Sequence, residues 1–193
     1  MQLLGREPAL GALIGWAIAQ QAVDQVAALL GADAADIVFT SGGSESNNLA
    51  IRGAAVSLRH RGNHIITSNV EHNAVIRSLK RLKGQGFKVT SLDVDAHGRV
   101  DPAAVADAIT DQTILVSIMH SNNETGTIQP IEAIARITRE HKIIFHTDAV
   151  DSVGVVPMDV QELGVDLMSF GSNTFYGPTG VGGLYIRRGT LIW

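Results

Sequence analysis

Apolar residues along the chain switch repeatedly between two kinds of spacing. Recurrence every three or four positions is typical of helices, whereas short apolar or alternating runs are typical of strands. The spacing predicts helices over residues 10–30, 44–59, 73–83, 102–109, 130–141 and 160–163. It predicts strands over residues 36–40, 63–68, 87–92, 113–119, 142–146, 167–170 and 183–186. Strands and helices therefore alternate almost throughout.

This alternation predicts an α/β fold, in which a mostly parallel open sheet carries helices on both faces. The apolar runs Ile114–Val116 and Ile143–Phe145 suit strands that are buried on both sides. The 193 residues are enough for one substantial core. Because no repeat, low-complexity tract or linker divides the chain, we expect residues 1–193 to form a single domain.

Composition and charge narrow the function classes. Apolar residues make up 45% of the chain and charged residues 18%, which is typical of a folded globular protein. The net charge is -4, and no basic run is longer than Arg187–Arg188, so we expect no nucleic-acid partner. The longest apolar run, Ala9–Ala19, is shorter than the roughly 20 residues that span a bilayer, so we expect no membrane insertion.

The chain contains no cysteine. Disulfide bonds, thiolate metal sites and a cysteine nucleophile are therefore excluded for this sequence. A reducing compartment is compatible with this composition, and we expect the protein to be cytoplasmic.

Polar segments follow five of the predicted strands. They comprise residues 41–48, 69–72, 120–124, 147–148 and 171–174. In open α/β sheets, ligands bind outside the carboxyl ends of the strands. Because these segments share that edge, the sequence predicts one pocket there, supplied with histidine, carboxylate, amide and hydroxyl groups.

The loop from Ser41 to Ser44 connects a strand to a helix and contains Gly42 and Gly43. Glycines let the backbone approach a ligand closely, and a helix start offers free N–H groups that suit a phosphate. The loop matches neither of the common nucleotide-binding glycine motifs. The alternative is that Ser44 simply caps the helix, with Glu45 beside it.

Three side chains near this edge have more than one interpretation. Asp148 ends a buried strand and needs a partner, which is either a pyridinium nitrogen or neighbouring loop groups. His72 can stack on an aromatic ligand, transfer protons or cap the next helix. His146 alternates with Asp148, so the two form a metal site if His72 or His120 joins them, although local spacing fixes no third ligand.

Several segments together resemble the cysteine desulfurases, which are pyridoxal-phosphate enzymes of the class V aminotransferase family. The resemblance covers about Gln25 to Arg188 and is carried by residues 39–53, 71–72, 117–126, 146–150 and 166–187. It implies the large domain of the fold-type I pyridoxal-phosphate enzymes and removal of sulfur from cysteine for iron–sulfur cluster assembly. It also implies a homodimer with an amino-acid ligand.

The resemblance assigns roles to particular residues. Gly43 and Ser44 lie in the segment that resembles the family's phosphate loop. His72 corresponds to the histidine that stacks on the cofactor ring, and Asn123 to an asparagine that contacts the cofactor. Asp148 corresponds to the aspartate that holds the pyridine nitrogen.

The departures from the family pattern gather in one part of the pocket. Thr174 stands where the family has the lysine that forms a Schiff base with the cofactor. Asp151 stands where a glutamine hydrogen-bonds the cofactor's phenolic oxygen. Gly171 and Asn173 replace a phosphate-binding serine and histidine, for which Ser172 substitutes in part. A later lysine of the loop is also replaced, by Thr179.

No other lysine is expected to supply the missing amine. The four lysines lie late on a predicted helix or at strand starts: Lys80, Lys83, Lys88 and Lys142. The sequence ends at Trp193, just after the last predicted strand, where the family continues into a small domain that carries the sulfur-accepting cysteine. We therefore expect that small domain to be absent.

These observations favour a desulfurase-like domain without catalytic residues of its own, a pseudoenzyme in which pyridoxal phosphate binds non-covalently or not at all. One alternative is a residual enzyme that holds the cofactor without a protein lysine, with His72 or Asp151 transferring protons. The other is a non-catalytic dimerisation or assembly module.

Overall fold

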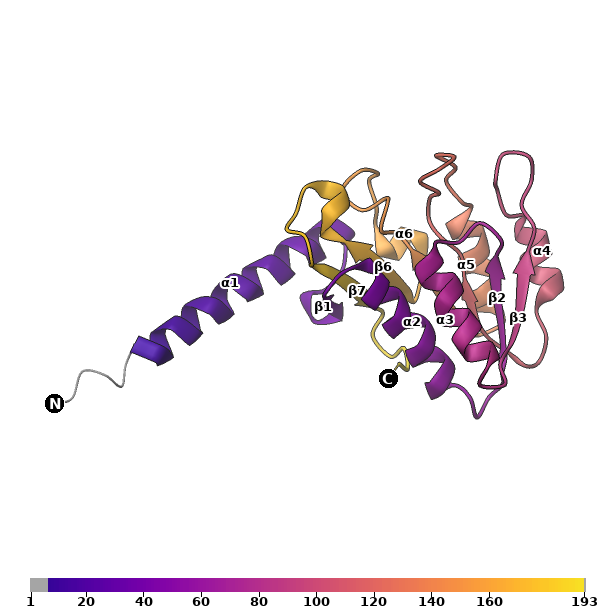
Figure 1. The fold of residues 1–193 in the computed structure, drawn as a ribbon, viewed down its shortest axis with the longest axis horizontal. Coiled ribbons are helices and arrows are strands. Elements are labelled where there is room, and N and C mark those ends of the chain that lie inside the picture. The colour runs from indigo at the N-terminus through magenta and orange to yellow at the C-terminus, as the bar shows by residue number, and fades with distance from the viewer. Residues whose placement is uncertain (1–6, 193) are drawn as a thin grey trace.

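A single seven-stranded sheet forms the centre of the computed structural model, which describes residues 7–192, with side chains from residue 17 on (Figure 1). The strands are β1 (Ile37–Thr40), β2 (His64–Ser68), β3 (Lys88–Leu92), β4 (Thr113–Ser117), β5 (Ile144–Asp148), β6 (Leu167–Gly171) and β7 (Gly182–Ile186). Their order across the sheet is β1-β7-β6-β5-β4-β2-β3. β7 is antiparallel to both of its neighbours, and the other pairs are parallel.

Helices cover both faces of this sheet, as the sequence predicts. They are α1 (Glu7–Leu30), α2 (Gly43–Ser57), α3 (Asn73–Lys83), α4 (Pro102–Ala108), α5 (Ile131–Glu140) and α6 (Val160–Leu163), with two 3-10 turns, η1 (Ala34–Asp36) and η2 (Ser172–Phe175). The C-terminal end of α1 packs with α4, α5 and α6 in one apolar cluster. α2 and α3 pack in the other. The predicted α/β class with a mostly parallel sheet is confirmed.

One predicted strand is displaced along the chain. The spacing predicts a strand over residues 142–146, but β5 runs from Ile144 to Asp148. Lys142 adopts a left-handed conformation with φ 56°, which an extended strand cannot contain. At the other end, Asp148 pairs with Ser169 of β6, so the ladder continues past the predicted boundary. Asp148 therefore belongs to the strand itself.

The direction of β7 decides which loops share an edge. β1 and β6 are both antiparallel to β7, so β1 runs parallel to β6 and to the rest of the sheet. The segments that follow β1, β2, β4, β5 and β6 consequently lie at one edge, where the sequence predicts the pocket.

α1 extends away from the body and reaches it only near its C-terminal end (Figure 1). There, Ala27 and Leu30 are buried in the core. Across residues 7–192, none of the helices combines the length and the apolar character that crossing a bilayer requires.

β6 and β7 pack closely where Gly183 of β7 lies opposite Phe170 of β6. Gly183 pairs with Phe170, and a Cβ atom added at Gly183 would overlap the Phe170 ring. Phe170 is itself almost fully buried, so the ring has little room to move. Close packing therefore requires glycine at this position.

We expect Gly183→Ala to lower the free energy of unfolding by about 1–3 kcal/mol, because the added methyl overpacks the core. Urea denaturation measures the change. Gly84→Ala is the matched control, since Gly84 is exposed, has φ -63° and has Arg81 O as its nearest neighbour at 3.3 Å. Equal losses in the two variants would contradict the packing argument.

Candidate functional site

A cleft of about 240 Å³ opens at the carboxyl edge of the sheet. It is lined by Gly43, Ser44, Asn47, His72, Asn123, Val150, Asp151 and Asn173. Of the eight residues that the sequence assigns to cofactor binding, the structure brings six into this lining. Asp148 lies behind Asn47, and Ser172 faces elsewhere. The cleft thus joins segments that are up to 130 positions apart in the sequence.

The start of α2 forms one side of the cleft. Gly42 is the N-cap residue and has no side chain to satisfy the first N–H groups of the helix. A Cβ atom at Gly43 would collide with the Val150 side chain, so glycine is needed where the helix meets the β5 loop. Ser44 lies inside the helix and does not cap it. Instead, the Glu45 carboxylate accepts a 2.6 Å hydrogen bond from the Ser41 N–H, which closes the loop.

Asp148 lies at the end of β5 and is only 5% exposed. Its Oδ2 accepts a 2.7 Å hydrogen bond from the Asn47 side-chain amide, and its Oδ1 accepts one of 3.1 Å from the Val150 N–H. Burial raises the pKa of Asp148 to about 6, although these two hydrogen bonds oppose the rise. The carboxyl is therefore held in place, and its protonation changes near neutral pH.

Asn47 was missed by the sequence reasoning, although it lies in the polar segment that follows β1. Its side-chain oxygen is buried and has no hydrogen-bond partner in the structure. Since Asn47 both lines the cleft and holds Asp148, this oxygen marks an acceptor that a ligand donor can satisfy. The direction of an asparagine side chain depends on packing, which the sequence alone does not give.

His72 is the N-cap of α3, where its Nδ1 accepts a 3.2 Å hydrogen bond from the Ala74 N–H. The capping interpretation is therefore confirmed. This bond requires Nδ1 to be unprotonated, so the proton of the neutral ring lies on Nε2. Because His72 also lines the cleft, capping orients the ring there and leaves stacking open as a second role.

Glu71, the neighbour of His72, is a second buried carboxyl behind the cleft. Its Oε1 accepts hydrogen bonds from Ser68 Oγ at 2.6 Å and from the Met119 N–H at 3.0 Å, which ties the end of β2 to the segment after β4. Its Oε2 is buried without a partner. Burial raises the pKa of Glu71 to about 8, and the nearby charge of Asp148 adds to the rise. Glu71 is consequently protonated at neutral pH.

Thr174 and Ser172 both lie in η2, and their hydroxyls bind backbone carbonyls. Thr174 Oγ1 lies 2.7 Å from Val150 O and 3.1 Å from Gly171 O. Ser172 Oγ donates to the carbonyls of Pro178 and Val181, so the structure does not bring it into the cleft. The 3-10 turn causes this difference, because it directs neighbouring side chains to different sides.

The metal interpretation of His146 is wrong. Its Nδ1 lies 2.8 Å from Ser117 Oγ and its Nε2 lies 2.9 Å from Ser169 Oγ, so both ring nitrogens are engaged inside the sheet. Burial lowers the pKa of His146 to about 3, which keeps the ring neutral. In the described part of the chain, no group of three or more histidine and carboxylate side chains is placed to hold a metal ion.

The four lysines lie away from the cleft. Lys80 and Lys83 are in the last turn of α3, Lys88 begins β3, and Lys142 precedes β5. These strand starts are at the edge of the sheet opposite the cleft. The lining of the cleft, as the structure describes it, contains no lysine.

The family model described as Aminotransferase class-V matches residues 15–191. The cysteine desulfurase IscS of Dictyoglomus turgidum is 53% identical over 173 residues, and that of Glaesserella parasuis is 55% identical over 178 residues. Each match covers 90% of this chain and 44% of the relative. The chain thus spans less than half the length of these curated relatives.

A solved structure titled "SspA in complex with cysteine" superposes with a TM-score of 0.86 at 41% sequence identity. The superposition covers 97% of this chain and 52% of that one.

Because the pKa of Glu71 is raised in the folded protein, the free energy of unfolding should depend on pH. The folded protein holds this proton with a pKa of about 8, against an ordinary value of 4.5. The contribution of Glu71 to stability is therefore complete below pH 4.5 and is lost as the pH rises through 8. Between pH 6.5 and 8, we expect the free energy of unfolding to fall by roughly 1–2 kcal/mol from this group.

Glu71→Gln removes the titration and keeps a side-chain oxygen for the Met119 N–H, so its stability should stay level over the same pH range. Urea denaturation at a series of pH values makes the comparison. Glu140→Gln, at an exposed position on α5, is the control and should keep the wild-type slope. Parallel slopes in wild type and Glu71→Gln would rule out a protonated Glu71.

Proposed function

The chain belongs to the class-V aminotransferase family, among its cysteine desulfurases, and we propose that it is a cofactor-binding domain that lacks their covalent catalysis. One observation carries the proposal. Thr174 stands in the position of the family's lysine, and its hydroxyl is bound to the carbonyls of Val150 and Gly171. A hydroxyl cannot form an imine with an aldehyde, so the covalent route through a lysine is closed.

The cleft nevertheless suits pyridoxal phosphate held without a covalent bond. The start of α2 at Gly43 and Ser44 faces the cleft and suits the phosphate group. The ring of His72 suits stacking, and Asn123 offers an amide beside it. The unpartnered side-chain oxygen of Asn47, which lines the cleft, adds an acceptor. When bound, pyridoxal phosphate supplies an electron-withdrawing pyridinium ring.

Asp148 would hold the proton on the pyridine nitrogen. A carboxylate with a pKa of about 6 is largely ionised at neutral pH, and a cation beside it lowers that pKa further. Asn47 and the Val150 N–H fix the two oxygens, so the carboxylate cannot turn away from its ligand. Asp148 is thus a binding and orienting group.

Asp151 opposes this binding. It lines the cleft, and its negative charge disfavours ionisation of Asp148. The family's glutamine at this position is neutral and donates a hydrogen bond to the phenolic oxygen, whereas a carboxylate repels that oxygen. We therefore propose weak, non-covalent cofactor binding and no sulfur removal by residues 1–193 alone.

A residual enzyme without a protein lysine is the first alternative. His72 and Asp151 both line the cleft, so either is placed to transfer a proton to a bound ligand. The relative solved with cysteine makes an amino acid the ligand class to propose. A role in iron–sulfur cluster assembly and a cytoplasmic location are further proposals, which rest on the family.

The second alternative is an assembly module that pairs two copies of the chain. α1 has 24 residues and leaves the body (Figure 1), which is favourable for an isolated helix only when something covers its apolar side chains. Ile18 is 63% exposed and Leu29 is 48% exposed. We propose that α1 of one copy packs against a second copy in a homodimer.

Pyridoxal phosphate should bind the wild-type protein reversibly, with a change in its visible spectrum that a Ser44→Ala, Asp148→Asn double variant abolishes. Borohydride treatment of the mixture should leave the residues of the cleft unmodified, because none of them carries an amine that can form an imine. Mass spectrometry checks this, and a reduced adduct that maps to the cleft would contradict the proposal.

Thr174→Lys combined with Asp151→Gln is the matched gain of function. It restores the amine and removes the opposing charge, so borohydride should now fix one cofactor per chain. If the folded double variant also binds no cofactor, the phosphate contacts of η2 are the limiting defect and the proposed fit of the cleft is wrong.

Ile18→Glu should convert a homodimer to a monomer, because it places a charge in the apolar side of α1. Sedimentation velocity measures the oligomeric state. Gln21→Glu adds the same charge at an exposed polar position of the same helix and should leave the dimer intact. A wild-type chain that sediments as a monomer at tens of micromolar would eliminate the pairing.

A further inference from the structure

A second cavity, of about 330 Å³, lies at the edge of the sheet opposite the cleft. Its walls come from α5, the segments that precede β5 and β6, and the segment that follows β7. β7 is antiparallel to its neighbours, so its carboxyl end meets the amino ends of β5 and β6. The cavity therefore shares no lining residue with the cleft.

Cations dominate this lining. Five basic residues and a single carboxylate line the cavity: Arg61, Arg139, Lys142, Arg187, Arg188 and Asp166. Arg188 pairs instead with Asp33 and Asp36, at 3.3 and 3.9 Å. Four cations then face one anion, which is a local charge of +3 in a chain whose net charge is -4. Such a concentration of positive charge in a cavity attracts anions.

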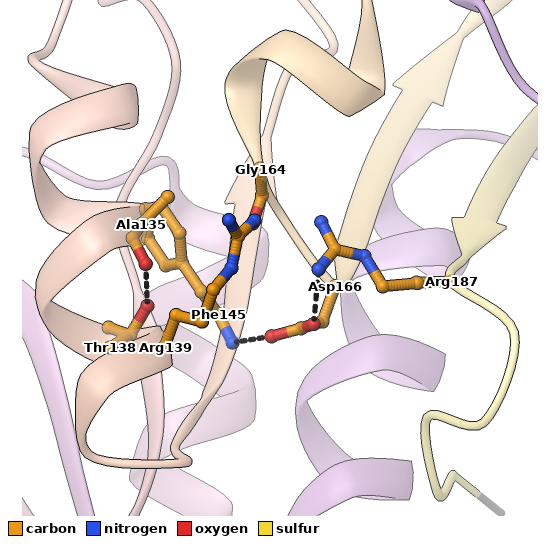
Figure 2. Close-up of polar contacts among 7 residues, drawn as sticks. All are labelled: Ala135, Thr138, Arg139, Phe145, Gly164, Asp166 and Arg187. Atoms are coloured by element: carbon orange, nitrogen blue, oxygen red, sulfur yellow. Dashed lines mark hydrogen bonds and ion pairs between the residues drawn. The ribbon is translucent and has the colours of Figure 1, made fainter.

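Asp166 pairs with one of these cations, Arg187, and leaves the others without a carboxylate partner in the cavity lining. Its Oδ2 accepts a 2.8 Å hydrogen bond from the Phe145 N–H, and its Oδ1 lies 3.5 Å from Arg187 Nη1. Figure 2 shows Arg139, from α5, and Arg187, from the end of β7, on either side of Asp166. The Nε of Arg187 is buried and has no partner in the structure. A buried N–H without an acceptor is unfavourable, so this guanidinium still lacks a ligand on one side.

Lys142 gives an independent indication that the cavity binds a ligand. It adopts φ 56° directly after the C-cap of α5, where glycine or asparagine is usual because a longer side chain is strained. The residue nonetheless lines the cavity with its neighbours. Strained backbone is retained mainly where the side chain has a use.

We propose that this cavity binds a small phosphate monoester. Arg139 donates one hydrogen bond to Gly164 O and Arg187 pairs with Asp166, so each guanidinium keeps further N–H donors for phosphate oxygens. A local charge of +3 favours a dianion over a monoanion. Apolar side chains of Leu58, Ile143 and Leu191 complete the wall and suit a short organic group. The volume lies at the lower end for ligand sites, so the organic group must be small.

Titration of ¹⁵N-labelled protein with phenyl phosphate tests this directly, with phenol as the uncharged control at constant ionic strength. Phenyl phosphate should produce saturable one-to-one shifts of amides around Gly164 and Gly189, and phenol should produce none. Arg139→Gln should weaken the affinity about tenfold, because it removes one charge-assisted contact. Arg136→Gln, an exposed arginine one turn earlier on α5, should leave it unchanged.

Lys142→Gly separates binding from folding. Glycine relieves the left-handed strain, so the variant should be at least as stable as wild type and yet bind phenyl phosphate several-fold more weakly. The proposal is overturned if the shifts fail to saturate, or if they appear only around Gly43 and Asn173 in the cleft. It is equally overturned if the Arg139→Gln and Arg136→Gln variants bind phenyl phosphate with the same affinity.

Discussion

The candidate cleft depends on close contact between backbones where β7 passes the loop after β1. A Cβ atom at Gly182 would lie 2.6 Å from the Gly42 backbone and 2.8 Å from the Phe170 carbonyl. Glycine at this position allows β7 to fit between β1 and β6. The start of α2 is thereby brought beside η2, and Gly43 and Ser44 line the cleft together with Asn173 and Asp151. Without this approach, the sheet would have no shared pocket at that side.

Much of this arrangement could be predicted from the sequence, because it follows from periodicity and from one rule about parallel sheets. The order of helices and strands and the shared edge belong to this class, whereas the six predicted cleft residues were assigned by the resemblance to the cysteine desulfurases. The contacts that each side chain makes could not be predicted in this way. Ser172 has the right chemistry for a phosphate, but a 3-10 turn directs it to the carbonyls of Pro178 and Val181. His146 has the spacing of a metal ligand, but serines from two other strands satisfy both nitrogens.

The two ends of the sheet differ in how they hold charge. At the cleft, burial raises the pKa of both Glu71 and Asp148, so the acids there hold their protons more tightly than acids in water. At the opposite end, Arg139, Lys142 and Arg187 line a cavity that contains a single carboxylate, Asp166. The charged residues that line the cavity are thus mostly basic, whereas the carboxyls of Glu71 and Asp148 lie at the other ends of the strands.

The hydrogen bonds of the Thr174 hydroxyl have a consequence for the stability of variants at this position. A Thr174→Lys substitution would give up the contacts with Val150 O and Gly171 O, which share one hydroxyl donor and together contribute on the order of 1 kcal/mol. Introducing an amine at this position therefore lowers the free energy of unfolding. The local hydrogen bonds thus favour threonine over lysine at position 174.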